Sequence, residues 1–195
     1  MKEIPLFPLP LVLFPGGRLP LQIFEVRYLD MVKSCMRENS GFGVVMLETG
    51  GEVFDGQNAL NDISTQGTYA VIVDFDQFPN GLLGIMTEGK KKFEIREKYE
   101  QGDHLLVAQV DFIDEEEEAP LPSDKVHLVT LLRSLMKDKW VAGLNYTVDF
   151  DAASEVGARL VELLPLAIKE KQRLFEIGNP LVRLEELDKV ITMLH

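Results

Sequence analysis

Residues 4–28 read IPLFPLPLVLFPGGRLPLQIFEVRY, and no other segment restricts the backbone as strongly. Prolines at positions 5, 8, 10 and 15 interrupt an otherwise apolar run. Each proline lacks a backbone N–H and disfavours the helical conformation of the residue before it, so residues 4–15 are predicted to be extended. We expect this segment at the edge of a sheet, because a central strand needs the missing donors.

The stretch leads into a predicted helix over residues 25–38. Val26, Leu29, Val32 and Met36 recur at helical spacing and form one apolar stripe, and Cys35 lies beside it. Gly41 follows, where a helix favours a C-terminal cap.

The residues up to about 113 carry short runs rich in β-forming side chains. Five of these runs are predicted strands, at 42–47, 67–75, 82–87, 92–98 and 105–112. Pro79-Asn80-Gly81 predicts a tight turn, because Asn-Gly tolerates the positive φ of hairpins. Short strands at close spacing predict a small antiparallel barrel or curled sheet, accompanied by the one helix.

Residues 114–122, DEEEEAPLP, mark a change in composition. Like charges repel and proline blocks strand pairing, so we expect an exposed connection. Beyond it, apolar spacing predicts helices at 124–136, capped by Ser123, and at 151–164, capped by Asp151. A third closes near Gly178, and a last one begins at Asn179-Pro180. The predicted fold class is α+β, with a β-rich subdomain over residues 1–118 and a helical bundle over residues 119–195.

Composition restricts the partners and the compartment. The 195 residues include 32 acidic and 20 basic ones, a net charge of −12, and a negative surface field disfavours nucleic-acid binding. Cys35 is the only cysteine, which rules out an intramolecular disulfide. No apolar run reaches the roughly 20 residues that span a membrane, and no signal-peptide pattern opens the sequence. We therefore expect a cytoplasmic protein without a membrane partner, whose oligomeric state the sequence leaves open.

Residues 4–28 resemble the opening of the Lon protease N-terminal domain, most closely in bacterial proteins where that domain stands alone. Shorter agreements follow in the family's order: Gly67-Thr68, Asn80-Gly81, Gly89, Lys92-Phe93, Leu163-Leu164-Pro165, Lys171-Gln172 and Arg183-Leu184. Val26 and Lys92 depart from the family pattern, which more often has proline and arginine there.

This resemblance implies a PUA-like β-barrel followed by a helical bundle, and recognition of protein substrates. In full Lon proteases an ATPase and a Ser-Lys protease domain follow. Because the sequence ends at His195, we expect no proteolysis by that mechanism.

Motifs that could carry chemistry have simpler structural interpretations. Residues 84–91, GIMTEGKK, nearly match a phosphate-binding loop. Lys91, however, stands where that loop needs Ser or Thr to hold Mg²⁺. We therefore expect a strand, a glycine turn and a second strand. Cys35 with His104 or His127 could form a nucleophilic pair, although a buried structural thiol is favoured. The histidines and paired acids lack metal-ligand spacing. The sequence thus predicts no catalytic residue, cofactor or metal site.

Candidate binding residues are Phe24, Arg27 and Tyr28 at the helix start, and Phe75 and Phe78 near the predicted turn. Packing within the fold is the competing interpretation for each of them. The sequence predicts a non-catalytic protein- or peptide-binding module, of adaptor or chaperone type. Two alternatives remain open, an RNA-binding PUA-like module using Lys90–Lys92, Arg96 and Lys98, and a hydrolase using Cys35.

Overall fold

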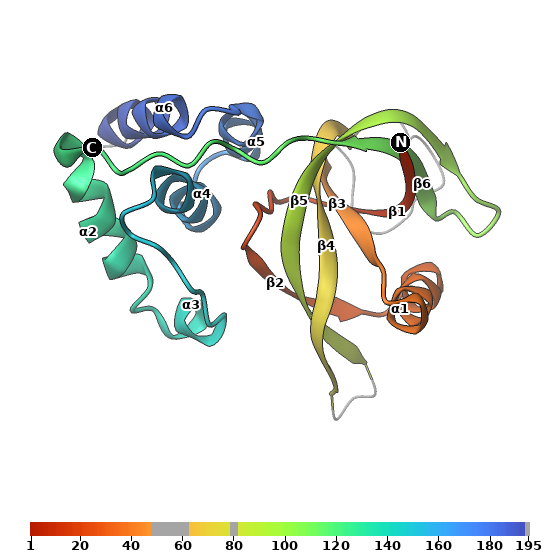
Figure 1. Ribbon diagram of the computed structural model, residues 1–195. Coiled ribbons are helices and arrows are strands. Elements are labelled where there is room, and N and C mark those ends of the chain that lie inside the picture. Colours follow the sequence, from red (N-terminus) through yellow and green to blue (C-terminus); the bar gives the residue numbers. More distant parts are fainter. Residues whose placement is uncertain (48–62, 79–81, 194–195) are drawn as a thin grey trace. The chain divides into compact units, whose positions relative to one another are not determined.

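The computed structural model describes residues 1–47, 63–78 and 82–193. The chain has an α+β architecture and folds as two compact units, Met1–Asp114 and Glu115–His195 (Figure 1). This division falls four residues before the predicted one at 118 and 119. Independent folding of each unit stays a prediction.

The first unit is a six-stranded curled sheet with one helix (Figure 1). Its elements are β1 (Lys2–Leu9), β2 (Arg18–Ile23), α1 (Val26–Glu38), β3 (Gly41–Leu47), β4 (Ile63–Gln77), β5 (Leu83–Glu100) and β6 (Leu106–Phe112). The strand order is β2-β5-β4-β3-β1-β6, and β5 also pairs with β6, so the sheet closes on itself. Among these pairs, only β1 and β3 run parallel.

Strand β1 does not occupy the edge position that its prolines predict. It lies between β6 and β3, with Lys2–Pro5 paired to β6 and Leu6–Leu9 paired to β3. Among the described residues each half thus has one strand neighbour, and this arrangement accommodates Pro5 and Pro8 although they cannot donate. The prediction of an extended segment is confirmed, and the prediction of an edge position was wrong.

The two predicted strands at 82–87 and 92–98 are one continuous strand, β5. Gly89, the expected turn, lies inside it and is bound to the loop after β1. Gly16 N–H donates to Gly89 O, and Gly89 N–H donates to Gly17 O, both at 2.9 Å. The segment that resembles a phosphate-binding loop is therefore extended sheet. The predicted turn at Pro79-Asn80-Gly81 lies outside the described residues.

Helix α1 occupies the predicted range, and Val32 and Leu29 of the predicted stripe pack on the core, but the buried face is rotated from the predicted one. Val26 and Met36, both expected to be buried, are exposed. The helix ends at Asn39, whose left-handed backbone, with φ of 50°, replaces the predicted cap at Gly41. The side chains that pack on the sheet are Tyr28, Met31, Val32 and Cys35.

Gly89→Ala is expected to destabilise the first unit. A Cβ at this position would lie 2.3 Å from Phe14 O, a backbone atom that accepts from the N–H of Gly17, which is itself bonded to Gly89. We expect a loss of about 1–3 kcal/mol in the free energy of unfolding, measured by urea denaturation. Gly102→Ala is the control, because no atom lies within 4 Å of its Cβ. Equal midpoints for the two variants would contradict the packing described at Gly89.

The second unit consists of helices that follow an extended segment. They are the 3₁₀ turn η1 (Ser123–Lys125), α2 (Val126–Leu135), α3 (Lys139–Gly143), α4 (Ala153–Leu163), α5 (Ile168–Glu176) and α6 (Pro180–Met193). Asn179 Oδ1 accepts from the N–H groups of Leu181 and Val182, which confirms the predicted cap. The caps predicted at Ser123 and Asp151 were wrong, because Lys125 and Ala152 precede those helices.

The acidic segment is bound into the second unit through Glu116, rather than being wholly solvated. Arg183, on α6, is 1% exposed, and its Nη1 donates to Glu116 Oε2 at 2.9 Å while Nη2 donates to Oε1. The same guanidinium donates to Leu174 O at 3.1 Å and Ile177 O at 2.6 Å. The buried charge therefore has a carboxylate and two carbonyl partners, which burial requires.

Glu116→Gln is expected to destabilise the second unit by about 3 kcal/mol, because it leaves a buried guanidinium without its opposing charge. The matched control is Glu117→Gln, which changes the same group at the exposed neighbouring position. Urea denaturation followed by circular dichroism measures both. The account is wrong if both variants unfold at the midpoint of the unsubstituted chain.

Candidate functional site

Three of the predicted binding residues meet at one end of the β4–β5 hairpin. Phe75 lies on β4, Phe78 follows it, and Phe24 follows β2. The register joins these strands, since Leu83 pairs with Gln77 on one side and with Ile23 on the other. The exposed fractions of Phe24, Phe75 and Phe78 are 56%, 60% and 38%. We call these three residues the aromatic end.

The aromatic end presents its rings on both faces of the hairpin. The Phe78 ring lies over Gly84, where a Cβ would be 2.6 Å from the ring. Phe75 pairs with Ile85, the residue that follows Gly84 on β5. Because side chains alternate between the two faces along a strand, Phe75 lies on the face opposite the Phe78 ring. Phe75 and Phe24 are thus the more open aromatic side chains, while Phe78 partly covers the hairpin itself.

Arg27 and Tyr28 serve the structure of α1. Arg27 Nε and Nη2 lie 2.9 Å and 2.8 Å from Glu25 Oε2, and Nη1 donates to His104 O at 2.9 Å. The Tyr28 ring is 6% exposed and stacks on Phe7, with ring centres 4.0 Å apart. The packing interpretation is therefore the one that the geometry supports for both residues.

Tyr28→Phe is expected to reduce the alkaline sensitivity of the first unit. Burial raises the pKa of Tyr28 to about 12, outweighing the Arg27 charge, which lowers it. The pKa of Tyr28 is thus higher in the folded chain than in the unfolded chain, where it is near 10. The folded state is therefore favoured while the hydroxyl is protonated, and this contribution to the free energy of unfolding is lost as the pH rises from 10 toward 12. Between about pH 8 and about pH 11 the unsubstituted chain should lose about 1 kcal/mol more than the variant, by urea denaturation. Equal losses would contradict the burial of the hydroxyl.

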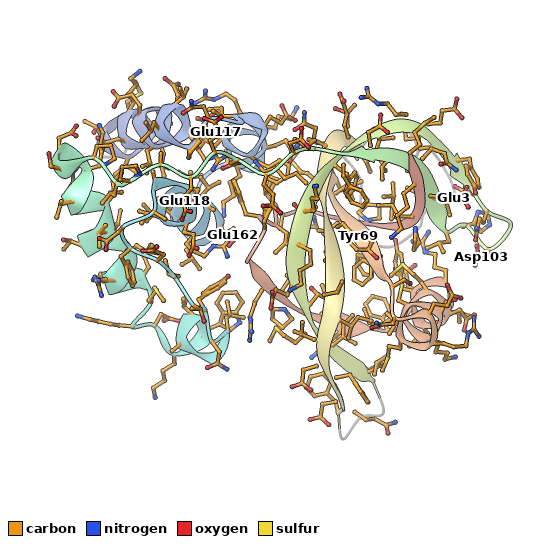
Figure 2. The ribbon with its side chains drawn as sticks, in the orientation of Figure 1. Glu3, Tyr69, Asp103, Glu117, Glu118 and Glu162 are labelled. Carbon is orange, nitrogen blue, oxygen red and sulfur yellow. The ribbon has the colours of Figure 1, made fainter. Side chains whose placement is uncertain are left out.

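The structure also shows a groove that the sequence does not predict. Its volume is about 320 Å³, and it lies between α1, the first half of β1 and the β5–β6 connection. The floor is apolar and includes Pro5, Met31 and Val107. Four carboxylates line it as well, those of Glu3, Asp30, Glu38 and Asp103, and among the described residues no Lys, Arg or His does. Figure 2 shows Glu3 and Asp103 at the same end of the first unit.

The groove escaped prediction because its acids are dispersed along the sequence, at positions 3, 30, 38 and 103. Only the pairing of β1 with β6 and the packing of α1 bring them together. The local sequence shows only that Glu3 and Pro5 lie on the same face of one strand, and this pattern is not specific to a groove.

Three of the basic residues proposed for RNA binding are engaged by contacts within the first unit. Lys92 is 7% exposed, and its Nζ lies 5.1 Å from the centre of the Phe14 ring. Lys90 pairs with Glu88, and Arg96 pairs with Glu94 and Asp111. Two of the five cationic side chains, Lys90 and Arg96, are thus paired with neighbouring acids.

Cys35 is 3% exposed, and burial raises the pKa of its thiol, which disfavours the reactive thiolate. His104, one of its proposed partners, lies with Nδ1 2.5 Å from Glu100 Oε1. Within residues 1–47, 63–78 and 82–193, no group of three or more His, Cys, Asp or Glu side chains could hold a metal ion. In the same part of the chain, no helix is both long and apolar enough to cross a membrane.

Comparison with known proteins identifies the family. The model of the ATP-dependent protease La (Lon) substrate-binding domain matches residues 3–193. The chain belongs to this family. The Lon protease of Parabacteroides distasonis is 28% identical over 192 residues, and that of Brevibacillus choshinensis 25% over 193. These matches cover 90% and 95% of this chain but only 22% and 24% of the relatives' lengths.

Solved structures agree with the family assignment. The crystal structure of a Lon N-terminal domain protein from Xanthomonas campestris is 32% identical, with a TM-score of 0.76, covering 96% of this chain and 97% of that one. The N-terminal domain of a Mycobacterium avium complex Lon protease is 14% identical with a TM-score of 0.59, and supports the fold alone. The family match over residues 3–193 and the Xanthomonas campestris structure confirm the resemblance first seen in residues 4–28.

Proposed function

We propose that this chain is a non-catalytic module that binds segments of other proteins, in an adaptor or chaperone-like role. The observation that carries the proposal is the match of residues 3–193 to a substrate-binding domain. The first unit then corresponds to a PUA-like barrel and the second to a helical bundle. The module acts in the cytoplasm, without a cofactor and apart from membranes.

The aromatic end supports this proposal. Aromatic side chains supply large contact areas and dominate the energy of many protein interfaces. Phe75, 60% exposed, stands on a strand paired along its length with β5, so its position is fixed before any partner binds. A rigid, open aromatic side chain is the kind of anchor that protein recognition uses.

Protein binding accounts for the structure better than the two alternatives do. Lys90 and Arg96 are paired with neighbouring acids, and the net charge of −12 repels a phosphate backbone. The buried Cys35 thiol lacks the electropositive, accessible setting of a nucleophile. Neither RNA binding nor hydrolysis therefore forms part of the proposal.

Affinity capture from a lysate of the source cells, with Phe75→Ala beside the unsubstituted chain, tests the proposal. We expect proteins to be captured whether or not nuclease is added, with recovery about fivefold lower for the variant, as for loss of one interface anchor. The matched control is Trp140→Ala, which removes another exposed aromatic side chain, 62% exposed, from the second unit.

Capture that disappears with nuclease would refute protein binding in favour of RNA. A loss with Trp140→Ala but not with Phe75→Ala would instead refute the assignment of the aromatic end.

A further inference from the structure

The groove beside α1 has a one-sided charge. Glu3 lies on β1, Asp30 and Glu38 lie on α1, and Asp103 lies on the β5–β6 connection. These carboxylates enter the groove from three different parts of the chain, and the lining residues that the structure describes include no cationic side chain. The whole chain has a net charge of −12, which adds to this field. The groove therefore attracts positive charge.

The existing partners of these carboxylates leave their charge available. Glu3 accepts from Gln109 Nε2 at 2.7 Å, and Asp103 accepts from the N–H of Leu105 at 3.1 Å, so both have neutral donors. Asp30 pairs with Lys33 at 3.1 Å, and Glu38 with Arg37 at 3.2 Å. All four side chains of those two ion pairs are more than half exposed. Exposed ion pairs contribute little to stability, so each carboxylate can exchange its partner for a cation of a ligand.

The floor of the groove is suited to apolar side chains. Met31 and Cys35 face it from α1, and Leu105 and Val107 face it from the sheet. These side chains belong to the core that holds α1 on the sheet, so the floor exists before a ligand binds. A ligand that fills the groove therefore needs apolar groups below and positive groups above.

The arrangement of the acids favours a polypeptide over a single ion. No group of three or more possible ligands converges on one point within the described residues, so the charge is spread rather than focused. Asp30 and Glu38 are eight residues apart on α1, about 12 Å along the axis. That length accommodates about four residues of an extended chain.

We propose that the groove binds an extended basic segment of a partner protein, with Lys or Arg side chains at its carboxylates and apolar side chains on its floor. The proposal rests on the proposed function, and it specifies the chemistry of the partner. It also assigns recognition to a surface separate from the aromatic end, built by α1, β1 and the β5–β6 connection.

Fluorescence anisotropy with labelled peptides tests this inference. The probe alternates leucine and lysine, and two comparison peptides carry glutamine or glutamate in place of lysine. At low salt the lysine peptide should bind most tightly. Glu3→Gln combined with Asp103→Asn should weaken that binding about fivefold to tenfold, because two favourable charge pairs are lost. High salt should remove the difference by screening.

Both substitutions keep the acceptor oxygens used by Gln109 and Leu105, so the fold should persist, and circular dichroism checks this. The matched control is Glu117→Gln with Glu118→Gln, which removes equal charge from exposed positions on the segment before the helices (Figure 2). It should bind the lysine peptide as the unsubstituted chain does.

Three outcomes would overturn the inference. Equal binding of the lysine and glutamine peptides would show that charge does not select the ligand, while protein binding itself would stand. An equal loss of affinity for the lysine peptide in the Glu117 and Glu118 control would show that net charge, and not the groove, causes the effect. If the lysine peptide does not bind at all, the groove has no such ligand, and capture from the lysate then decides separately whether the chain binds proteins.

Discussion

The first unit depends on how β1 is shared between two neighbours. Lys2–Pro5 pairs with β6 and Leu6–Leu9 pairs with β3, so one proline-rich strand joins β6 to β3 and the rest of the sheet. Alternation along β1 then sends Leu6 into one apolar core and Phe7, stacked under Tyr28, into the other. The same strand places Glu3 and Pro5 beside α1, and the groove exists because of that placement.

The acidic residues of the chain have different roles that net charge alone cannot distinguish. Glu116 neutralises the buried Arg183 and is part of the structure of the second unit. Glu3 and Asp103 accept hydrogen bonds from the neutral donors of Gln109 and Leu105 and line a groove. Glu117 is exposed. A charge of −12 thus includes structural, recognition-competent and solvated carboxylates, and a substitution at each should have a different consequence.

Features set by local sequence were predictable, and features set by distant contacts were not. The cap at Asn179, the range of α1 and most strand positions follow from short-range preferences. The continuity of β5 through Gly89 depends on hydrogen bonds to Gly16 and Gly17, more than 70 residues earlier. The Glu116–Arg183 pair spans 67 positions. The three phenylalanines of the aromatic end were sequence candidates in two separate groups, and only the pairing of β2 and β4 with β5 brings them to one end. The groove likewise required knowledge of which strands pair.

The most direct test of this account is a nuclear magnetic resonance titration of the isotope-labelled chain with the leucine–lysine peptide. The account predicts that backbone amide shifts change along α1 from Asp30 to Glu38 and across residues 101–107, which form the two walls of the groove. Changes confined to the aromatic end or to the helices of the second unit would contradict the assignment of the groove as the site that recognises basic segments.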